Sequence, residues 1–419
     1  MARSAARSTG TIYGLVCLSR FGTAGQSVCR PLPHKEKVAL MSNFSVRLFA
    51  FGAICAALAS GTSAANAQVL DPNAYTSDGV LSLASGTYTL DTDALTFAGN
   101  SGVLSNGIAV FDFSSINVAA NATVNVIGSH PLALLSQSDA TFGAGSSFNL
   151  KGGNGGPGST GQPASVIPNY GTPGAAGSGG YSGGNGGGFG SSYNSFYPSP
   201  GNGPNGGYFR NGGGFGGGGG KVNGGFGPIY GNLLTKLEGG SGGGGGFHEY
   251  GDEQDYGGGG GGGGGGAIEI NAIGAITIKG SLNANGGGGN GGDYSGGGGA
   301  GGGILLAGNR ITLTATGQIN AKGGAGGAGT LGSAGAGGGG GRIDIQTVLP
   351  DGFSSNGAFD VNGGLGYPQF ITGGFLSDTN GANGVITVST AVPEPGAGSL
   401  VVAILGAVPV VAALRRRRK

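Results

Sequence analysis

Apolar and polar residues alternate in short clusters along the chain, and glycine-rich stretches separate many of these clusters. In "AIEINAIGAITIKG", Ile268 and Ile270 flank Glu269, and the alternation returns at Ile276 and Ile278. Because successive side chains of a strand point to opposite faces, this spacing predicts β-strands with one apolar face. Strand starts recur every six to eight residues, so the predicted strands are short.

The alternating clusters belong to a longer repeat. Ile268, Ile304 and Ile343 each follow a glycine run and start equivalent strands, 36 and 39 residues apart. Each copy then reaches Asn-x-(Asn/Lys)-Gly-Gly or a close variant, and a degenerate fourth copy occupies residues 131–156. Residues 79–128 show the same short clusters of alternating apolar and polar residues, but without glycine runs. A fixed period of this length is typical of stacked repeat architectures.

Strands of three or four residues with one apolar face are not stable alone. Stacked as coils, each strand pairs with its equivalent one turn along, and the inward residues form a narrow core. Ile311, Leu313, Ile319 and Ala321 repeat the inward pattern of the preceding copy. We therefore predict an all-β fold, a parallel β-helix (solenoid) with glycine-rich loops and a glycine-rich insertion.

The ten glycines of residues 257–266 lead directly into the Ile268 strand. A flexible linker has no reason to keep that register, so we expect the runs to be loops that leave and re-enter the coil at one corner. Only glycine allows close backbone approach between stacked loops. The sequence leaves open whether polyglycine strands pack side by side. We interpret residues 152–266 as a large insertion there, partly ordered or disordered.

Composition narrows the class of protein. Glycine supplies 106 of 419 residues without a strict period of three, which excludes a collagen triple helix. Charged residues are only 9% of the chain, unlike ordinary charged disorder. Residues 68–392 hold eight Lys or Arg and seventeen Asp or Glu, a balance of −9. This acidic balance argues against nucleic acid as a partner.

The N-terminal part has the pattern of a secretory signal. From Met41, Arg47 is followed by the apolar run 48–58 and by Ala65-Asn66-Ala67, the small-x-small pattern that signal peptidase accepts. We predict a signal peptide at residues 41–67, cleaved between Ala67 and Gln68. Residues 1–40 are then an upstream extension from start-codon choice, or alternatively an extended n-region. Cys17, Cys29 and Cys55 all precede the cleavage site, so the mature chain has no disulfide.

The other end combines three parts in order. Val392-Pro393-Glu394-Pro395 is an extended segment, because proline fixes its own backbone and restricts the residue before it. Residues 396–414 carry no charge and have the length of a transmembrane helix. The chain then ends in cations that the positive-inside rule keeps in the cytoplasm: Arg415, Arg416, Arg417, Arg418 and Lys419.

This tripartite tail, residues 392–419, resembles the PEP-CTERM sorting signal of bacterial exosortase substrates. The resemblance implies a Gram-negative bacterium that makes extracellular polysaccharide, and an exosortase that cuts near Pro393-Glu394-Pro395. The expected partners are signal peptidase, exosortase, the inner membrane before processing, and extracellular polysaccharide. Pro409 within the helix is a small departure, and a plain C-terminal anchor is the alternative. Between the two ends, we expect residues 68–151 to form the N-terminal coils of the β-helix and residues 267–391 to form its glycine-rich repeats.

The candidates for site chemistry are few. Asp252, Glu253 and Asp255 offer oxygen ligands for calcium, but their spacing matches no EF-hand loop, so a solvated acidic tip is favoured and no cofactor is expected. Glu269 and Asp344 share one offset in two copies and would line an outer face, although Leu305 interrupts that row.

We expect a non-catalytic, exported cell-surface or exopolysaccharide-matrix protein with a structural or adhesive role. It would be secreted across the inner membrane, held briefly by its tail, and then processed. The alternative is a β-helix polysaccharide lyase or hydrolase, which needs converging carboxylates, or a base with Arg or Lys. A third possibility is an ice- or mineral-binding surface on a flat glycine-rich face.

Overall fold

The fold is that of a computed structural model, which describes most of the chain between residues 69 and 390. The described ranges are 69–158, 162–163, 171–186, 188–189, 195–196, 198–222, 227–247, 254–255, 257–292, 294–329, 334–367, 370–371, 374–375 and 379–390. Chain contacts divide the protein at residues 65 and 66, and all described residues belong to the second unit. Within the described ranges the protein is mostly β, with one short 3₁₀ helix, η1 (Pro72–Ala74).

An eleven-stranded sheet, sheet A, contains most of the longer strands, and its pairing is parallel except between β5 and β6. Its strands are β1 (Val80–Leu83), β5 (Val103–Ser105), β6 (Ile108–Phe113), β7 (Ser115–Val118), β9 (Leu132–Ser136), β10 (Ala140–Phe142), β16 (Ala267–Ile278), β18 (Gly303–Leu313), β20 (Arg342–Thr347), β21 (Phe353–Ser355) and β25 (Val385–Thr390).

An eight-stranded sheet, sheet B, is also parallel apart from a small antiparallel end formed by β2, β3 and β4. Its strands are β2 (Gly86–Asp91), β3 (Thr96–Phe97), β4 (Asn100–Ser101), β8 (Ala122–Ile127), β11 (Ser147–Asn149), β17 (Ser281–Asn283), β19 (Gln318–Asn320) and β22 (Ala358–Asp360). Three two-stranded antiparallel ribbons complete the set: β12 (Gln162–Pro163) with β15 (Gln254–Asp255), β13 (Gly188–Phe189) with β14 (Ser195–Phe196), and β23 (Phe370–Ile371) with β24 (Gly374–Phe375).

The predicted repeat is confirmed by the strand register. Ile268 of β16 pairs with Ile304 of β18, which pairs with Ile343 of β20. The degenerate copy joins the same row, because Leu132 of β9 pairs with Ile268. Each repeat therefore places its sheet A strand beside the equivalent strand of the next repeat. The same holds in sheet B, where β11, β17 and β19 follow one another.

The predicted inward positions form one continuous core between the two sheets. The alternating residues that were expected to point inward are all buried there: Ile268, Ile270, Ile276, Ile278, Leu282, Ala284, Ile311, Leu313, Ile319 and Ala321. Phe142 and Phe148 meet edge to face in the same cluster, with ring centroids 5.4 Å apart. One-sided burial of many short strands is what makes each of them stable in this context.

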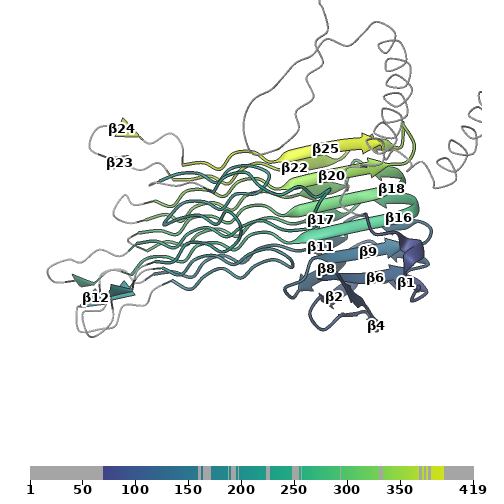
Figure 1. Ribbon diagram of the computed structural model, residues 1–419, viewed down its shortest axis with the longest axis horizontal. Helices are drawn as coiled ribbons and strands as arrows, with labels where there is room; N and C mark the ends of the chain where they lie inside the picture. Colours follow the sequence, from purple (N-terminus) through teal and green to yellow (C-terminus); the bar gives the residue numbers. More distant parts are fainter. Residues whose placement is uncertain are drawn as a thin grey trace, which may run out of the picture. The chain divides into compact units, whose positions relative to one another are not determined.

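As expected, the glycine runs leave and re-enter the strands at one fixed place in each repeat, and the structure decides the question left open, how the runs pack. The glycine runs are extended segments that lie side by side and bond to one another through the backbone (Figure 1). Outgoing segments leave sheet B at 150–158, 284–292, 321–329 and 361–367. Returning segments lead into sheet A at 257–266, 294–302, 334–341 and 379–384.

The run 257–266 shows how these segments are joined. Gly260, Gly263 and Gly266 donate their N–H groups to the outgoing segment 150–158, at N–O distances of 2.7–2.9 Å. Gly259, Gly262 and Gly265 donate to segment 294–302, whereas Gly261 and Gly264 donate to residues 181–184. Every third residue of the run therefore hydrogen-bonds to the same neighbouring segment. That is the periodicity of a polyproline-II-type helix, which has three residues per turn and no hydrogen bonds within the helix.

The carbonyl groups of the same run accept hydrogen bonds from three other segments with the same spacing of three residues. They accept from residues 171–177, from 240–246 and from 287–290. The segment therefore has six hydrogen-bonded neighbours and leaves no N–H unpaired from Gly259 to Gly266. A methyl group on Gly262 would overlap the carbonyl oxygen of Gly287, and one on Gly264 would overlap that of Gly240. Glycine is required here by the distance between backbones.

The residues of the insertion take part in this array. Segment 171–177 lies beside the first returning segment, while 180–186, 210–214, 216–220 and 239–246 bond to the returning segments opposite the outgoing ones. These segments of the insertion are therefore structural members of the glycine array. Phe215, Leu233 and Leu237 from the same insertion pack on Leu305, on the outer side of β18.

Candidate functional site

The outer face of sheet B carries a row of asparagines. In β11, Phe148 points into the core, so Ser147 and Asn149 point outward. Asn149 is in register with Asn125 of β8 and Asn283 of β17, and Asn320 of β19 follows. Asp360 of β22 continues the row. The parallel register thus aligns one amide from each repeat, and we call residues 125, 149, 283 and 320 the asparagine ladder.

The ladder is held together by its own side chains. Asn149 Nδ2 donates to Asn125 Oδ1 at 3.1 Å, Asn283 Nδ2 donates to Asn149 Oδ1 at 3.1 Å, and Asn320 Nδ2 donates to Asn283 Oδ1 at 2.8 Å. An amide has two N–H donors and an oxygen with two lone pairs, so these bonds leave part of its capacity for a ligand. Asn283 is only 8% exposed and its Nδ2 already faces three acceptors, so the capacity for further bonds lies on the partly exposed Asn125, Asn149 and Asn320.

A second polar row runs beside the ladder. Thr123, Ser147, Ser281 and Gln318 are aligned by the same register. Ser147 Oγ donates to Asn149 Oδ1 at 2.9 Å, and Asn283 Nδ2 approaches both Ser147 Oγ and Ser281 Oγ at 3.2 Å. The hydroxyls of Ser147 and Ser281 consequently fix the orientation of the Asn149 and Asn283 amides.

The polar face continues onto the outgoing glycine segments. Because these segments have three residues per turn, residues 322, 325 and 328 are exposed while those between them are buried. Lys322 N donates to Asn285 Oδ1, and Gly288 N donates to Asn154 Oδ1, each at 2.8 Å. The face is mainly uncharged, and Lys322 lies 4.0 Å from the carboxylate of Asp360.

Such a face suits a ligand that is rich in hydroxyl groups. Hydroxyls donate and accept like the amide and serine groups of the two rows, and neighbouring strands repeat these groups about every 4.8 Å. The described residues contain no group of three or more His, Cys, Asp or Glu side chains that could hold a metal ion.

Comparison with protein families, with curated proteins and with solved structures found no match for this chain. Among the described residues, no helix has the length and apolar character needed to cross a membrane.

The expected row of Glu269 and Asp344 requires a correction. The register does align Glu269 with Leu305 and Asp344, so the predicted interruption at Leu305 is confirmed. Neither carboxyl lies on an open surface, because Glu269 is 1% exposed and Asp344 is 8% exposed. The N-terminal segment covers Glu269, and Leu70 N donates to its Oε1 at 2.7 Å. Burial raises the pKa of Glu269 to about 8.

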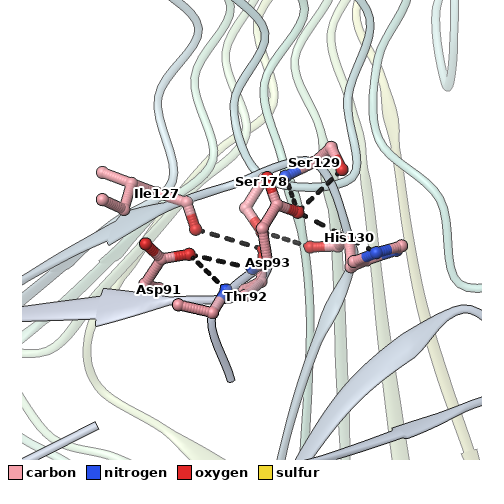
Figure 2. Close-up of polar contacts among 8 residues, drawn as sticks. Asp91, Thr92, Asp93, Ile127, Ser129, His130 and Ser178 are labelled. Carbon is pink, nitrogen blue, oxygen red and sulfur yellow. Dashed lines mark hydrogen bonds and ion pairs between the residues drawn. The ribbon is translucent and has the colours of Figure 1, made fainter. Parts of the chain in front are cut away.

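His130 lies in a cluster of polar contacts with Asp93, Ser129 and Ser178 (Figure 2). Its Nε2 lies 3.9 Å from Asp93 Oδ1, and the same oxygen accepts from the N–H and the hydroxyl of Ser129 at 2.8 and 2.7 Å. These hydrogen bonds from Ser129 hold the pKa of Asp93 below its usual value. Ser178 Oγ donates to the carbonyl oxygen of His130 and not to its imidazole. The cluster joins two turns to the insertion and is not a nucleophile–base pair.

The remaining predicted site residues fall outside the described residues. They are the cleavage positions Ala65, Ala67 and Gln68, the acidic residues Asp252 and Glu253, the sorting motif Val392 to Pro395, and the cations Arg415 to Lys419. Asp255 is described only as a backbone position in β15. These assignments stay predictions.

Sequence reasoning missed the asparagine ladder, although its signal was present. Asn149, Asn283 and Asn320 are the first residues of the Asn-x-(Asn/Lys)-Gly-Gly ending, and Asp360 stands at the same place in the last copy. Along one strand the motif indicates only a repeat. Its chemistry becomes evident once the strands are known to stack in register.

Proposed function

We propose that this chain is an exported, exosortase-processed protein of the cell surface or exopolysaccharide matrix, with a structural or adhesive role. We further propose that its stacked repeats are the coils of a parallel β-helix. Delivery rests on the signal sequence and on the PEP-CTERM-like tail. The molecular role rests on the asparagine ladder, an ordered and mainly uncharged row of amides beside a row of hydroxyls.

The polar face accounts for adhesion in a simple way. A neutral polysaccharide chain lying along the ladder meets one amide and one hydroxyl or amide group per repeat on neighbouring strands. Each single hydrogen bond contributes about 0.5–1.5 kcal/mol, so binding depends on the number of repeats engaged. A row that is already ordered loses little side-chain freedom on binding.

Changing the ladder is expected to weaken this binding. The double variant Asn149→Val and Asn320→Val removes two ladder amides, and we expect its affinity for a neutral polysaccharide to fall about tenfold or more, equivalent to about 1.4 kcal/mol. Co-sedimentation of the purified protein with cellulose measures the effect, and alginate provides an acidic comparison. Gln346→Val, on sheet A, is the control and should bind as the wild type does. Equal binding by both variants would contradict this role.

The tail makes a separate prediction. Replacing Pro393, Glu394 and Pro395 with alanine should leave unprocessed protein in the inner membrane, because the sorting enzyme loses its extended motif. Mass spectrometry of membrane and surface fractions gives both termini of the protein. Ser399→Ala, inside the uncharged segment 396–414 but outside the motif, should leave processing unchanged. Normal processing of the triple-alanine variant would exclude the exosortase assignment.

The enzymatic alternative has its own readout. Incubating the purified protein with cellulose or alginate, with and without calcium, should produce no new chain ends. New reducing ends would indicate a hydrolase and new unsaturated ends a lyase, and either result would replace the structural role with a catalytic one.

A further inference from the structure

A cavity of about 420 Å³ lies against the outer side of sheet A, away from the asparagine ladder. Its walls combine polar residues with aliphatic side chains from four parts of the chain: Leu70, Ile108, Leu233, Leu237 and Leu305. The volume is within the range of small-molecule sites, which runs from about 300 to 1,000 Å³.

The covering segments create this cavity. Leu70 and η1 lie over the first strands, with Leu70 packing on Val110, Ala133 and Leu135. Leu233 and Leu237 lie over β16 and β18, packing near Ala267 and Leu305. Glu269 belongs to β16 and lines the space where these coverings meet. The sequence gives no sign of the cavity, because its walls are brought together only by the tertiary fold.

Glu269 is the more deeply buried of the two carboxyl residues that line the cavity. Its Oε1 accepts the Leu70 N–H, and no hydrogen bond from a described residue reaches its Oε2. The side chain is nevertheless 1% exposed, so that oxygen has little access to bulk water. Burying a carboxyl without a partner is unfavourable, and a ligand that bonds to Oε2 would remove this cost.

The charges around the cavity indicate the sign of that ligand. Lys236 and Glu238 also line it, but they neutralise each other, with Nζ and Oε2 2.8 Å apart. The described lining therefore has one carboxyl, that of Glu269, without a cationic partner. We propose that this cavity binds a small organic amine, with its aliphatic part against the leucines and its ammonium group on Glu269.

Proton release distinguishes such a ligand from one that is merely apolar. Burial raises the pKa of Glu269 to about 8, so the empty site holds a neutral carboxyl at pH 7. An incoming ammonium group favours the ionised carboxylate, and Glu269 then gives its proton to the buffer. An apolar alcohol of the same length causes no such release.

Calorimetry of the full chain with n-hexylamine, n-hexanol and hexanoate at pH 7 tests the proposal. We expect hexylamine to bind at least tenfold more tightly than the other two, with release of close to one proton, measured in buffers of different ionisation enthalpy. Glu269→Gln should abolish the preference while keeping an acceptor for Leu70 N–H. Asp344→Asn, a buried carboxyl in the same register row but outside the cavity, should retain it.

Equal binding of hexylamine and hexanol would overturn the proposal, as would an unchanged preference in Glu269→Gln. If circular dichroism shows that Glu269→Gln does not fold, the wild-type measurement decides, since binding without proton release rules out the ion pair. Neither outcome bears on the asparagine ladder, because the ladder lies on the other sheet.

Discussion

Replacing Gly287 with alanine is expected to destabilise the protein by about 2 kcal/mol or more, whereas the same change at the next residue should be nearly neutral. Gly287 donates to Gly263 and accepts from Gly299 in the glycine array. A methyl group on it would overlap the carbonyl oxygen of Gly153. That oxygen accepts the Gly263 N–H, so moving it breaks a further bond of the array.

Gly288 is the matched control. A methyl group there would meet its nearest atom, the carbonyl oxygen of Ala325, at 3.4 Å, an ordinary contact distance. The next repeat already has alanine at the equivalent position, Ala325, which is exposed. Alanine also restricts the unfolded chain, which contributes about 0.4–1 kcal/mol of stability where the backbone accepts it. Gly288→Ala should therefore be neutral or slightly stabilising.

Urea unfolding of the two variants, followed by circular dichroism, measures the difference. Hydrogen exchange adds a local test, because the amides of 259–266 should exchange faster in Gly287→Ala than in Gly288→Ala. If both variants unfold at the same urea concentration, the backbones are not packed as closely as the array requires, and the side-by-side arrangement of the runs is wrong.

The stability of the wild-type protein is expected to fall between about pH 4.5 and pH 8 because of Glu269. Its pKa is raised by burial from 4.5 to about 8 in the folded state, so the folded protein binds a proton that the unfolded chain has released. The contribution to stability is complete below pH 4.5 and is lost as the pH rises through 8. A shift of this size corresponds to a change on the order of 5 kcal/mol.

Asp112 also makes the protein less stable as the pH rises, but over a lower pH range than Glu269. Burial raises its pKa to about 6, although Gln137 Nε2 donates to its Oδ2 at 2.8 Å. No described group hydrogen-bonds to its buried Oδ1. The change in stability between pH 6 and pH 8 is therefore due mainly to Glu269. Variants are best compared over this pH range.

Glu269→Gln isolates this effect, because glutamine has the same shape and does not ionise. Chemical unfolding at pH 5, 6, 7 and 8 should show a loss of stability for the wild type and a nearly flat profile for the variant above pH 6. Asp112→Asn should flatten only the lower part. Parallel profiles for the wild type and Glu269→Gln would mean that this carboxyl is solvated and ionised in the folded protein.

Much of the strand arrangement could be predicted from the sequence. The spacing of Ile268, Ile304 and Ile343 gave the register of β16, β18 and β20, and the alternation around Thr277 and Asn283 gave the buried face. Such patterns are reliable because a one-residue slip would turn every apolar side chain outward. The candidate site was less predictable, since the asparagine ladder is a row across strands and not a motif along one.

The sequence by itself determined which residues face the core and how often the strands recur. The delivery signals at the ends of the chain stay predictions from the sequence. Only the tertiary structure decided what the glycine runs do and what covers Glu269. A glycine has no side chain, so its position in the sequence does not indicate what it contacts. The role of Gly262 becomes evident only in the folded chain, where six other segments surround its run. Leu70 and Leu237 are likewise far from Glu269 in the chain, and burial by distant segments leaves no local trace.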